Sequence, residues 1–282
     1  MAAPDRPLLT QVFSPSAFQE LFAAWTRFPE ALPFAGGTEL IRYQGGKTLT
    51  LPKNIISLDK IDELQRITRT ERYLEIGAMV KLGDIIRMGK IVPDALRFCL
   101  EGISGPQLRC LATIGGNICT AGRRLDASAA MIALDATYEL RSASQTRWIS
   151  ASRFSLLPGP LAFKSQELLT RIRIPLDQWN YTAYRKFGSR DAGKAGGALV
   201  FIIKNPKNIL TDIRIVFAGE GILRDKNNES LLIGKHLPLN RRDALDFVEH
   251  WKTCLSALDS PSLIVRSEIL KFIESLILNL AD

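Results

Sequence analysis

Phe-Ala-Gly-Gly-Thr-Glu-Leu at residues 34–40 is a polar turn with a glycine pair inside apolar sequence, and it is one of the two most informative segments of the chain. Such a turn can present several backbone N–H groups to a phosphate, because glycine has no Cβ to hold the anion away. We predict a helix over 38–46 that leaves this turn, with Thr38 as its cap and its N-terminus facing the anion. A single glycine pair is more often only a tight turn.

A second glycine pair stands in Ala-Thr-Ile-Gly-Gly-Asn at residues 112–117. Thr113 and Asn117 add side-chain donors there, as Thr38 does in the first turn. Two such loops suggest two phosphates, and a dinucleotide carries a pyrophosphate that can be held from both sides by charge-assisted hydrogen bonds. The chain has neither Gly-x-Gly-x-x-Gly after a strand nor Gly-x-x-x-x-Gly-Lys-Ser/Thr. Neither a Rossmann crossover nor a nucleoside triphosphatase loop is therefore expected.

Length and composition set further bounds. The chain has 282 residues, 46% of them hydrophobic and 23% charged, which is enough for two domains. Its formal charge of +8 is dispersed, with only Arg123-Arg124 and Arg241-Arg242 as tight pairs, so nucleic acid is not expected, whereas an acidic partner subunit is compatible. Residues 1–13 lack the apolar core of a secretory signal, so we expect a cytoplasmic protein. Charges within 263–281 indicate an amphipathic helix and no membrane span.

Cysteine and histidine usage argues against metal or histidine chemistry within this chain. The four cysteines lack Cys-x-x-Cys spacing, so we expect reduced core or loop thiols and no iron–sulfur cluster or structural zinc. The two histidines, His236 and His250, have no evident Cys, Ser or Asp companion in the sequence. The cysteines are Cys99, Cys110, Cys119 and Cys254.

Hydrophobic patterning predicts alternating helices and strands, followed after residue 178 by an antiparallel sheet with helices. Asp126 can cap a helix over 127–135, or accept a hydrogen bond from a ribityl or ribose hydroxyl, or do both. The expected helices are 15–27, 38–46, 81–88, 93–101, 127–135, 240–258 and 261–281, and the expected strands are 54–58, 73–76, 137–141, 167–174, 181–187, 197–204 and 209–218. The fold class is therefore α+β.

Taken together, several motifs resemble the FAD-binding, medium subunit of molybdenum hydroxylases of the carbon monoxide and xanthine dehydrogenase type. These motifs are the 34–40 loop, Leu-Arg-Cys-Leu-Ala-Thr-Ile-Gly-Gly-Asn-Ile at 108–118, Asp126 before Ala-Leu-Asp-Ala at 133–136, Tyr-Arg-Lys-Phe-Gly-Ser-Arg at 184–190, Leu-Glu-Ile-Gly-Ala-Met-Val at 74–80 and Leu-Leu-Thr-Arg-Ile-Arg-Ile-Pro at 168–175. The resemblance implies a vanillyl-alcohol-oxidase-type FAD-binding domain over 1–177, in two subdomains that divide near 55–60. A C-terminal α+β domain over 178–282 follows it.

The resemblance also implies a function. A molybdopterin large subunit oxidises the substrate, two [2Fe-2S] clusters of a small subunit pass the electrons on, and FAD in this chain delivers them to an external acceptor, which is NAD, oxygen or a quinone. By the same resemblance, the FAD diphosphate lies at Ala35, Gly36, Gly37, Thr38, Glu39 and Leu40 and at Thr113, Ile114, Gly115, Gly116 and Asn117. Asp126 then meets ribityl or adenosine hydroxyls, Leu169 lies beside the isoalloxazine, and Lys186 lies close to the ring or is only a solvated strand lysine.

One departure from the family pattern falls after the second loop. Where the family often has Ser-Pro, this chain has Gly122-Arg123, followed by Arg124. Two guanidinium groups there could add phosphate contacts or crowd the usual path of the cofactor. The alternative function is therefore a non-catalytic assembly subunit that kept the fold and lost FAD.

Overall fold

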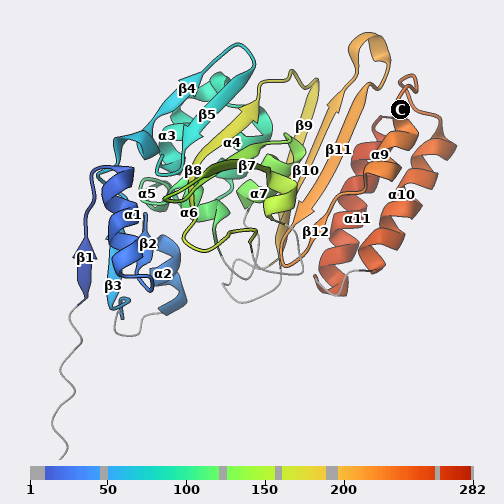
Figure 1. Ribbon diagram of the computed structural model, residues 1–282. Helices are drawn as coiled ribbons and strands as arrows, with labels where there is room; N and C mark the ends of the chain where they lie inside the picture. Colours follow the sequence, from blue (N-terminus) through green and yellow to red (C-terminus); the bar gives the residue numbers. More distant parts are fainter. Residues whose placement is uncertain are drawn as a thin grey trace, which may run out of the picture.

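Three β-sheets, each covered by helices, make up the chain in the computed structural model (Figure 1). The structure describes residues 10–44, 50–120, 126–155, 161–188, 196–257 and 261–280. The first sheet is parallel, and the other two are antiparallel. The predicted α+β class is therefore confirmed.

The first sheet has the order β1-β3-β2, formed by Gln11–Phe13, Asn54–Ser57 and Leu32–Phe34. Helix α1 (Phe18–Arg27) connects the outer strands, and its buried face carries Phe18, Leu21, Phe22 and Trp25. Helix α2 (Thr38–Gln44) leaves the first glycine loop directly after β2. This small parallel sheet therefore holds the 34–40 loop at its edge.

The second sheet has the order β4-β5-β8-β6-β7, formed by Ile67–Arg69, Tyr73–Gly77, Leu168–Pro175, Thr137–Arg141 and Thr146–Ser150. Strand β6 alternates between buried and half-buried residues, which is typical of a sheet with one face on the core. The helices between its strands are α3 (Leu82–Arg87), α4 (Asp94–Glu101), α5 (Pro106–Arg109), α6 (Ile114–Ile118), α7 (Asp126–Ala133) and α8 (Ala151–Phe154). Short 3₁₀ turns cover Asp62–Gln65, Gly89–Ile91 and Pro206–Asn208.

The third sheet has the order β12-β11-β10-β9, formed by Ile222–Leu223, Asp212–Ala218, Gly197–Lys204 and Tyr181–Phe187. Side chains of β10 alternate between two cores: Ala198, Val200 and Ile202 pack with the second sheet and its helices, and Leu199, Phe201 and Ile203 pack with the C-terminal helices. These helices are α10 (Arg241–Ser256) and α11 (Leu263–Leu278), and α9 (Lys226–Leu232) precedes them. Figure 1 shows the sheet between α7 and the α10–α11 pair.

All of the expected helices and strands exist; β6, β9 and β10 have the predicted bounds, and the ends of the others differ. The predicted cap at Thr38 is wrong: Ile41 N–H donates to the Gly37 carbonyl, so Gly37 holds the cap position and Thr38 is the first helical residue. Strand β11 begins at Asp212 because a 3₁₀ turn occupies Pro206–Asn208. The sequence patterns did not reveal the short strands β1, β2, β4, β7 and β12 or the short helices α5, α6, α8 and α9. None of the helices in the described part of the chain combines the length and apolarity needed to cross a bilayer.

Candidate functional site

The two glycine loops lie against each other. A Cβ built on Gly36 would stand 2.1 Å from the carbonyl oxygen of Leu111, two residues before Thr113. A Cβ on Gly115 would stand 2.7 Å from both the Cβ and the carbonyl oxygen of Ala78. These two glycines therefore permit close contact between backbone segments. The sequence pattern predicts another role for them, that of an open cradle for an anion.

Protein groups already occupy the N–H groups of the second loop. Ile114 and Gly115 donate to the carbonyls of Val80 and Ala78, at 3.0 and 2.8 Å. Gly116 donates to the Thr113 hydroxyl, which caps α6, and Asn117 donates to the Thr113 carbonyl. The second loop therefore forms a rigid wall, and its backbone from 114 to 117 does not offer free donors.

The first loop is different. Within the described part of the chain, no hydrogen bond occupies the N–H groups of Gly36 and Gly37, and Thr38, in the first turn of α2, has no intrahelical acceptor for its N–H. Gly37 has φ +66°, a left-handed conformation that favours glycine. Glu39 forms a two-pronged ion pair with Arg42, at 2.6 and 2.9 Å, which holds this carboxylate on the helix. Anion-binding capacity is thus concentrated at 36–38.

A cavity of about 400 Å³ opens where the loops meet. Four residues of the expected cofactor site line it, namely Ala35, Gly115, Gly116 and Leu169. The rest of the lining is Trp25, Pro33, Leu58, Ala78, Met79, Cys119, Phe163, Lys164, Gln166, Glu167 and Leu168. A largely apolar cavity with a few polar groups is typical of a cofactor site. The other expected cofactor residues do not line this cavity; they are Gly36, Gly37, Thr38, Glu39, Leu40, Thr113, Ile114, Asn117, Asp126 and Lys186.

A buried carboxylate, Glu167, stands at the edge of this cavity. Its two oxygens accept hydrogen bonds from Arg147 Nε and Nη2, each at 2.7 Å, and one of them also accepts from Lys164 N–H at 2.8 Å. The Arg147 guanidinium holds the pKa of Glu167 below its usual range. The ion pair fixes the 161–168 segment that closes the cavity.

We expect Glu167→Gln to lower the free energy of unfolding by about 1–3 kcal/mol at neutral pH, because it removes a charge-assisted hydrogen-bond pair. A lowered folded-state pKa stabilises the protein above the unfolded pKa of about 4.3, and this contribution is lost as the pH falls through the folded pKa. The difference between wild type and variant should therefore shrink on acidification. Urea unfolding at several pH values measures it, with the exposed Glu63→Gln as control. A difference that does not change with pH would contradict this account.

Asp126 and Lys186 form a second centre. Lys186 Nζ on β9 lies 2.7 Å from Asp126 Oδ2 at the start of α7, where the aspartate side chain is 9% exposed and the lysine side chain is 53% exposed. Burial raises the pKa of the neighbouring Cys99 and Tyr184, and the Asp126 charge adds to both effects, so neither group ionises near neutral pH. The structure thus brings together two expected site residues that are 60 positions apart.

These residues fit a bound FAD in one more respect. The Oδ1 atom of Asn117 is buried without a hydrogen-bond partner among the described residues, and this residue directly follows the cavity-lining Gly116. A buried acceptor normally has a donor, and cofactor hydroxyls are donors. Burial raises the pKa of the cavity-lining Cys119 to about 12, which keeps its thiol neutral and apolar.

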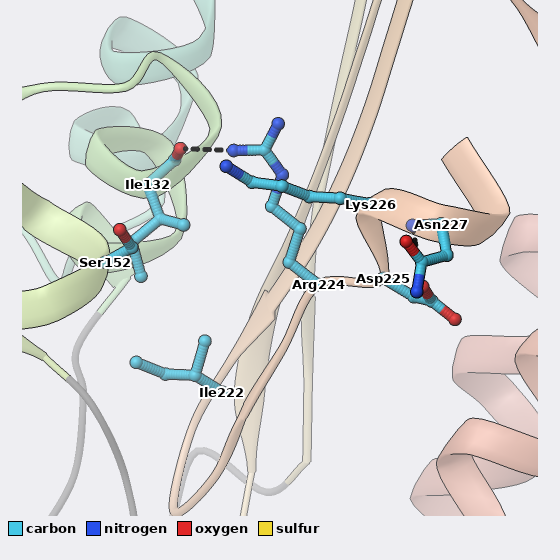
Figure 2. A pocket seen from close by; sticks show the side chains of 7 residues that line it. All are labelled: Ile132, Ser152, Ile222, Arg224, Asp225, Lys226 and Asn227. Carbon is cyan, nitrogen blue, oxygen red and sulfur yellow. Dashed lines mark hydrogen bonds between the residues drawn. The ribbon is translucent and has the colours of Figure 1, made fainter. Parts of the chain in front are cut away.

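A second cavity, of about 370 Å³, lies between α7, α8 and the β12–α9 segment (Figure 2). Ile132, Ser152, Ile222, Arg224, Asp225, Lys226 and Asn227 line it. Arg224 donates to the Ile132 carbonyl at 3.2 Å and pairs with Asp135 and Glu229, so it joins the third sheet to α7. None of the expected cofactor residues lines this cavity.

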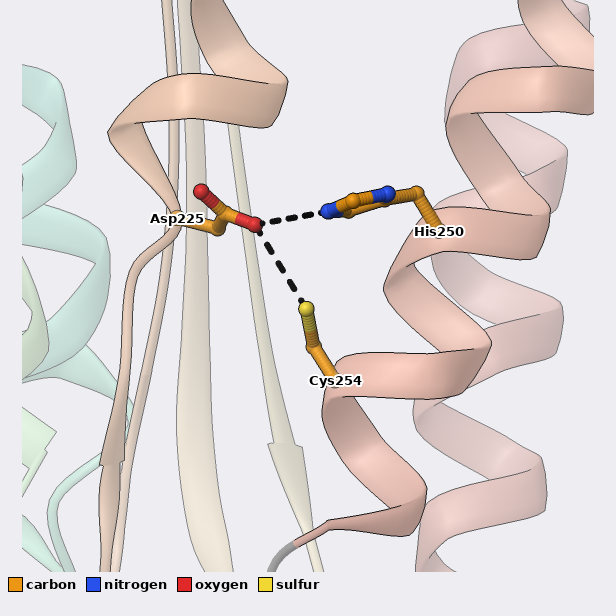
Figure 3. A group of neighbouring side chains, drawn as sticks. All are labelled: Asp225, His250 and Cys254. Atoms are coloured by element: carbon orange, nitrogen blue, oxygen red, sulfur yellow. Dashed lines mark hydrogen bonds and ion pairs between the residues drawn. The ribbon is translucent and has the colours of Figure 1, made fainter.

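The expectation that His250 lacks an Asp or Cys companion was wrong. His250 Nε2 and Cys254 Sγ, on one face of α10, lie 3.1 and 3.5 Å from Asp225 Oδ2 (Figure 3). The i,i+4 spacing of His250 and Cys254 could have revealed their shared face. Asp225 is 25 residues away and could not have been assigned. Gly122, Arg123 and Arg124 lie outside the described residues.

The sequence patterns also did not reveal part of the cavity lining, including Trp25, Phe163, Gln166 and Glu167. Trp25 was placed on a predicted helix, and its large apolar side chain gave no sign of which cavity it meets. Gln166 donates to the Trp25 carbonyl across 141 residues of sequence, a contact that only the tertiary structure brings about.

The α+β fold and the cavity between two glycine loops define a cofactor-binding protein, and the comparisons with known proteins specify which kind. Residues 8–177 match the family model described as the FAD binding domain in molybdopterin dehydrogenase. The chain belongs to this family. It is thus an oxidoreductase component whose cofactor is FAD.

Two relatives and one solved structure illustrate the similarity. The glyceraldehyde dehydrogenase medium chain of Sulfolobus acidocaldarius is 29% identical over 73% of this chain and 74% of its own length. The nicotinate dehydrogenase FAD-subunit of Eubacterium barkeri is 26% identical over 92% of this chain and 91% of its own. Carbon monoxide dehydrogenase from Hydrogenophaga pseudoflava superposes with a TM-score of 0.79, at 23% identity, over 98% of each chain. The last similarity establishes the fold.

Proposed function

We propose that the chain is the electron-transfer flavoprotein subunit of a multi-subunit molybdopterin-dependent dehydrogenase. The single observation that carries this proposal is the cavity in which both glycine loops and Leu169 meet. Its partners are an iron–sulfur small subunit and a molybdopterin large subunit, as the medium-chain and FAD-subunit names of the relatives suggest. Bound FAD accepts electrons from one donor and passes them to another acceptor, here NAD, oxygen or a quinone.

In this proposal, the protein residues bind and orient the cofactor. The N–H groups of Gly36, Gly37 and Thr38 hold the diphosphate, and the wall at Thr113 to Asn117 fixes its position. Asn117 Oδ1 and Asp126 accept hydrogen bonds from cofactor hydroxyls, and Ala35, Leu40 and Leu169 exclude water. Glu39 and Ile114 support the two loops. Asp126 also holds the Lys186 amine, whose positive charge would stabilise negative charge on a bound, reduced flavin electrostatically.

We also propose the domain division given by the resemblance, with FAD-binding subdomains that meet near 55–60 and a C-terminal domain from 178. The three sheets support it, because the first ends at Ser57, the second spans 67–175 and the third begins at Tyr181. A cytoplasmic location fits the four cysteines, which form no disulfide.

Purification of the tagged full chain from its own organism tests the proposal. We expect flavin, molybdenum, iron and acid-labile sulfide to co-purify with it, together with two further polypeptides. Partners without any flavin would favour the alternative, an assembly subunit that has lost FAD. Flavin without molybdenum or iron would contradict the proposed partners.

A cavity-filling variant locates the flavin. Because Ala35 lines the cavity, Ala35→Leu should reduce FAD affinity by at least about tenfold, equivalent to about 1.4 kcal/mol. Fluorescence titration measures it, and Ala23→Leu on the exposed face of α1 is the control. Unchanged affinity in Ala35→Leu would place the flavin elsewhere.

A further inference from the structure

A group of Asp225, His250 and Cys254 lies in the C-terminal domain, on elements that line neither of the glycine loops (Figure 3). Asp225 precedes α9, and the other two residues project from α10 toward it. Each residue offers one possible ligand atom, namely a carboxylate oxygen, an imidazole nitrogen or Sγ, and these three atoms lie within 4.8 Å of one another. We propose that these three residues form a zinc-type metal site with one open coordination position.

The separations between the ligand atoms suit tetrahedral coordination. With metal bonds of about 2.0 Å to nitrogen and oxygen and about 2.3 Å to sulfur, tetrahedral angles require about 3.3 Å between N and O and about 3.5 Å between S and O. The structure has 3.1 Å between His250 Nε2 and Asp225 Oδ2, and 3.5 Å between Cys254 Sγ and the same oxygen. Two of the three distances between ligand atoms therefore already match tetrahedral coordination without a bound metal.

Asp225 is oriented for this role by the helix that it precedes. Its Oδ1 accepts from the N–H groups of Asn227 and Asn228, at 3.0 and 3.1 Å, and so caps α9. The other oxygen, Oδ2, is thereby aimed at α10. Hydrogen bonds that fix a ligating carboxylate are a regular feature of metal sites.

The arrangement does not suit nucleophilic catalysis. Activation of a thiol requires an imidazole next to the sulfur, with the carboxylate behind the imidazole. Here the carboxylate stands between the two, because the Cys254 thiol donates to Asp225 Oδ2 and His250 Nε2 contacts the same oxygen. The same arrangement suits a metal ion. The ion would replace the thiol proton of Cys254, which is released to solvent, and would bind the Nε2 lone pair of a His250 imidazole protonated at Nδ1.

His250 is half-exposed, with 50% of its side chain accessible, so a metal ion can enter from solvent and retain a water ligand. The bound ion would join the start of α9 to α10. Arg224, the residue before Asp225, reaches Asp135 and the Ile132 carbonyl, so the same ion would stabilise the contact between the C-terminal domain and α7.

Titration of the chelator-treated full chain with Co²⁺ alone tests the proposal, because Co²⁺ reports tetrahedral geometry by its ligand-field absorption and a thiolate ligand by a charge-transfer band. We expect one bound Co²⁺ per chain with both signals, which Zn²⁺ displaces. Cys254→Ser should abolish the charge-transfer band, and Asp225→Asn, which keeps an oxygen to cap α9, should weaken binding by more than about tenfold.

Matched controls come from the chain itself. Cys110 is an exposed cysteine outside this group, and His236 is the other histidine. Cys110→Ser and His236→Gln should leave the titration unchanged, and His250→Gln should weaken it. The proposal is overturned if the charge-transfer band persists in Cys254→Ser, if the wild type shows only octahedral Co²⁺, or if wild type and His250→Gln bind equally.

Discussion

Gly36→Ala is expected to abolish measurable FAD binding and to lower the free energy of unfolding by about 2–4 kcal/mol. The new Cβ would lie 2.1 Å from the Leu111 carbonyl oxygen, and a backbone atom cannot move aside as a flexible side chain can. The two loops must then separate, and the cavity that both of them border loses its shape. Urea unfolding and FAD fluorescence titration measure the two effects.

Gly83→Ala is the matched control for this change. Gly83 lies in α3, and the nearest neighbour of a Cβ added there would be the Arg109 carbonyl oxygen at 3.5 Å, an ordinary van der Waals distance. A helical glycine replaced by alanine gains up to about 1 kcal/mol. Gly83→Ala should therefore be at least as stable as wild type and bind FAD normally. A Gly36→Ala protein with wild-type stability and affinity would show that the loops do not need to touch.

Asp126→Ala and Lys186→Met are expected to separate cofactor binding from stability. Asp126→Ala removes the carboxylate proposed to accept a cofactor hydroxyl, so FAD affinity should fall by at least about tenfold. Lys186→Met should affect mainly stability and the flavin redox potential, because it leaves a 9%-exposed carboxylate without its lysine. Since the lysine is half-exposed, we expect a loss of only about 1 kcal/mol at neutral pH.

Urea unfolding at neutral pH measures the stability of both variants, and fluorescence titration measures their FAD affinity. The control is Asp243→Ala, which removes a more exposed aspartate in the first turn of α10 that pairs with Lys235 at 2.6 Å. Equal FAD affinities in Asp126→Ala and Asp243→Ala would exclude Asp126 from the site.

The sequence predicted the longer elements well because their patterns are local. Strand β10 is a continuous apolar run between turn residues, and α11 repeats Ile269, Ile273 and Leu276 on one buried face. Strands β1, β2 and β4 have three residues each and no period to detect. Their pairing depends on partners far away in the chain, such as Val12 with Ile55.

The sequence predicted the part of the site that local motifs define, and it did not predict the part that depends on distant residues. The glycine loops stood out as motifs, and the structure places them in contact. The sequence did not reveal why glycine is needed at position 36, because the reason is the carbonyl of Leu111, which is 75 residues away. Likewise, the N–H groups of Ile114 and Gly115 are occupied by carbonyls of the 78–80 segment, more than 30 residues earlier in the chain. A motif can indicate that donors are present, but only tertiary structure shows which of them are occupied.

The flavin content of the purified full chain, measured by absorbance after incubation with FAD and desalting, tests the claim that this chain holds one FAD. We predict one FAD per chain for wild type and for Gly83→Ala. For Ala35→Leu, we predict that FAD affinity falls by at least about tenfold. A wild-type chain that retains no flavin at saturating FAD, alone and together with its purified partner subunits, would contradict the claim.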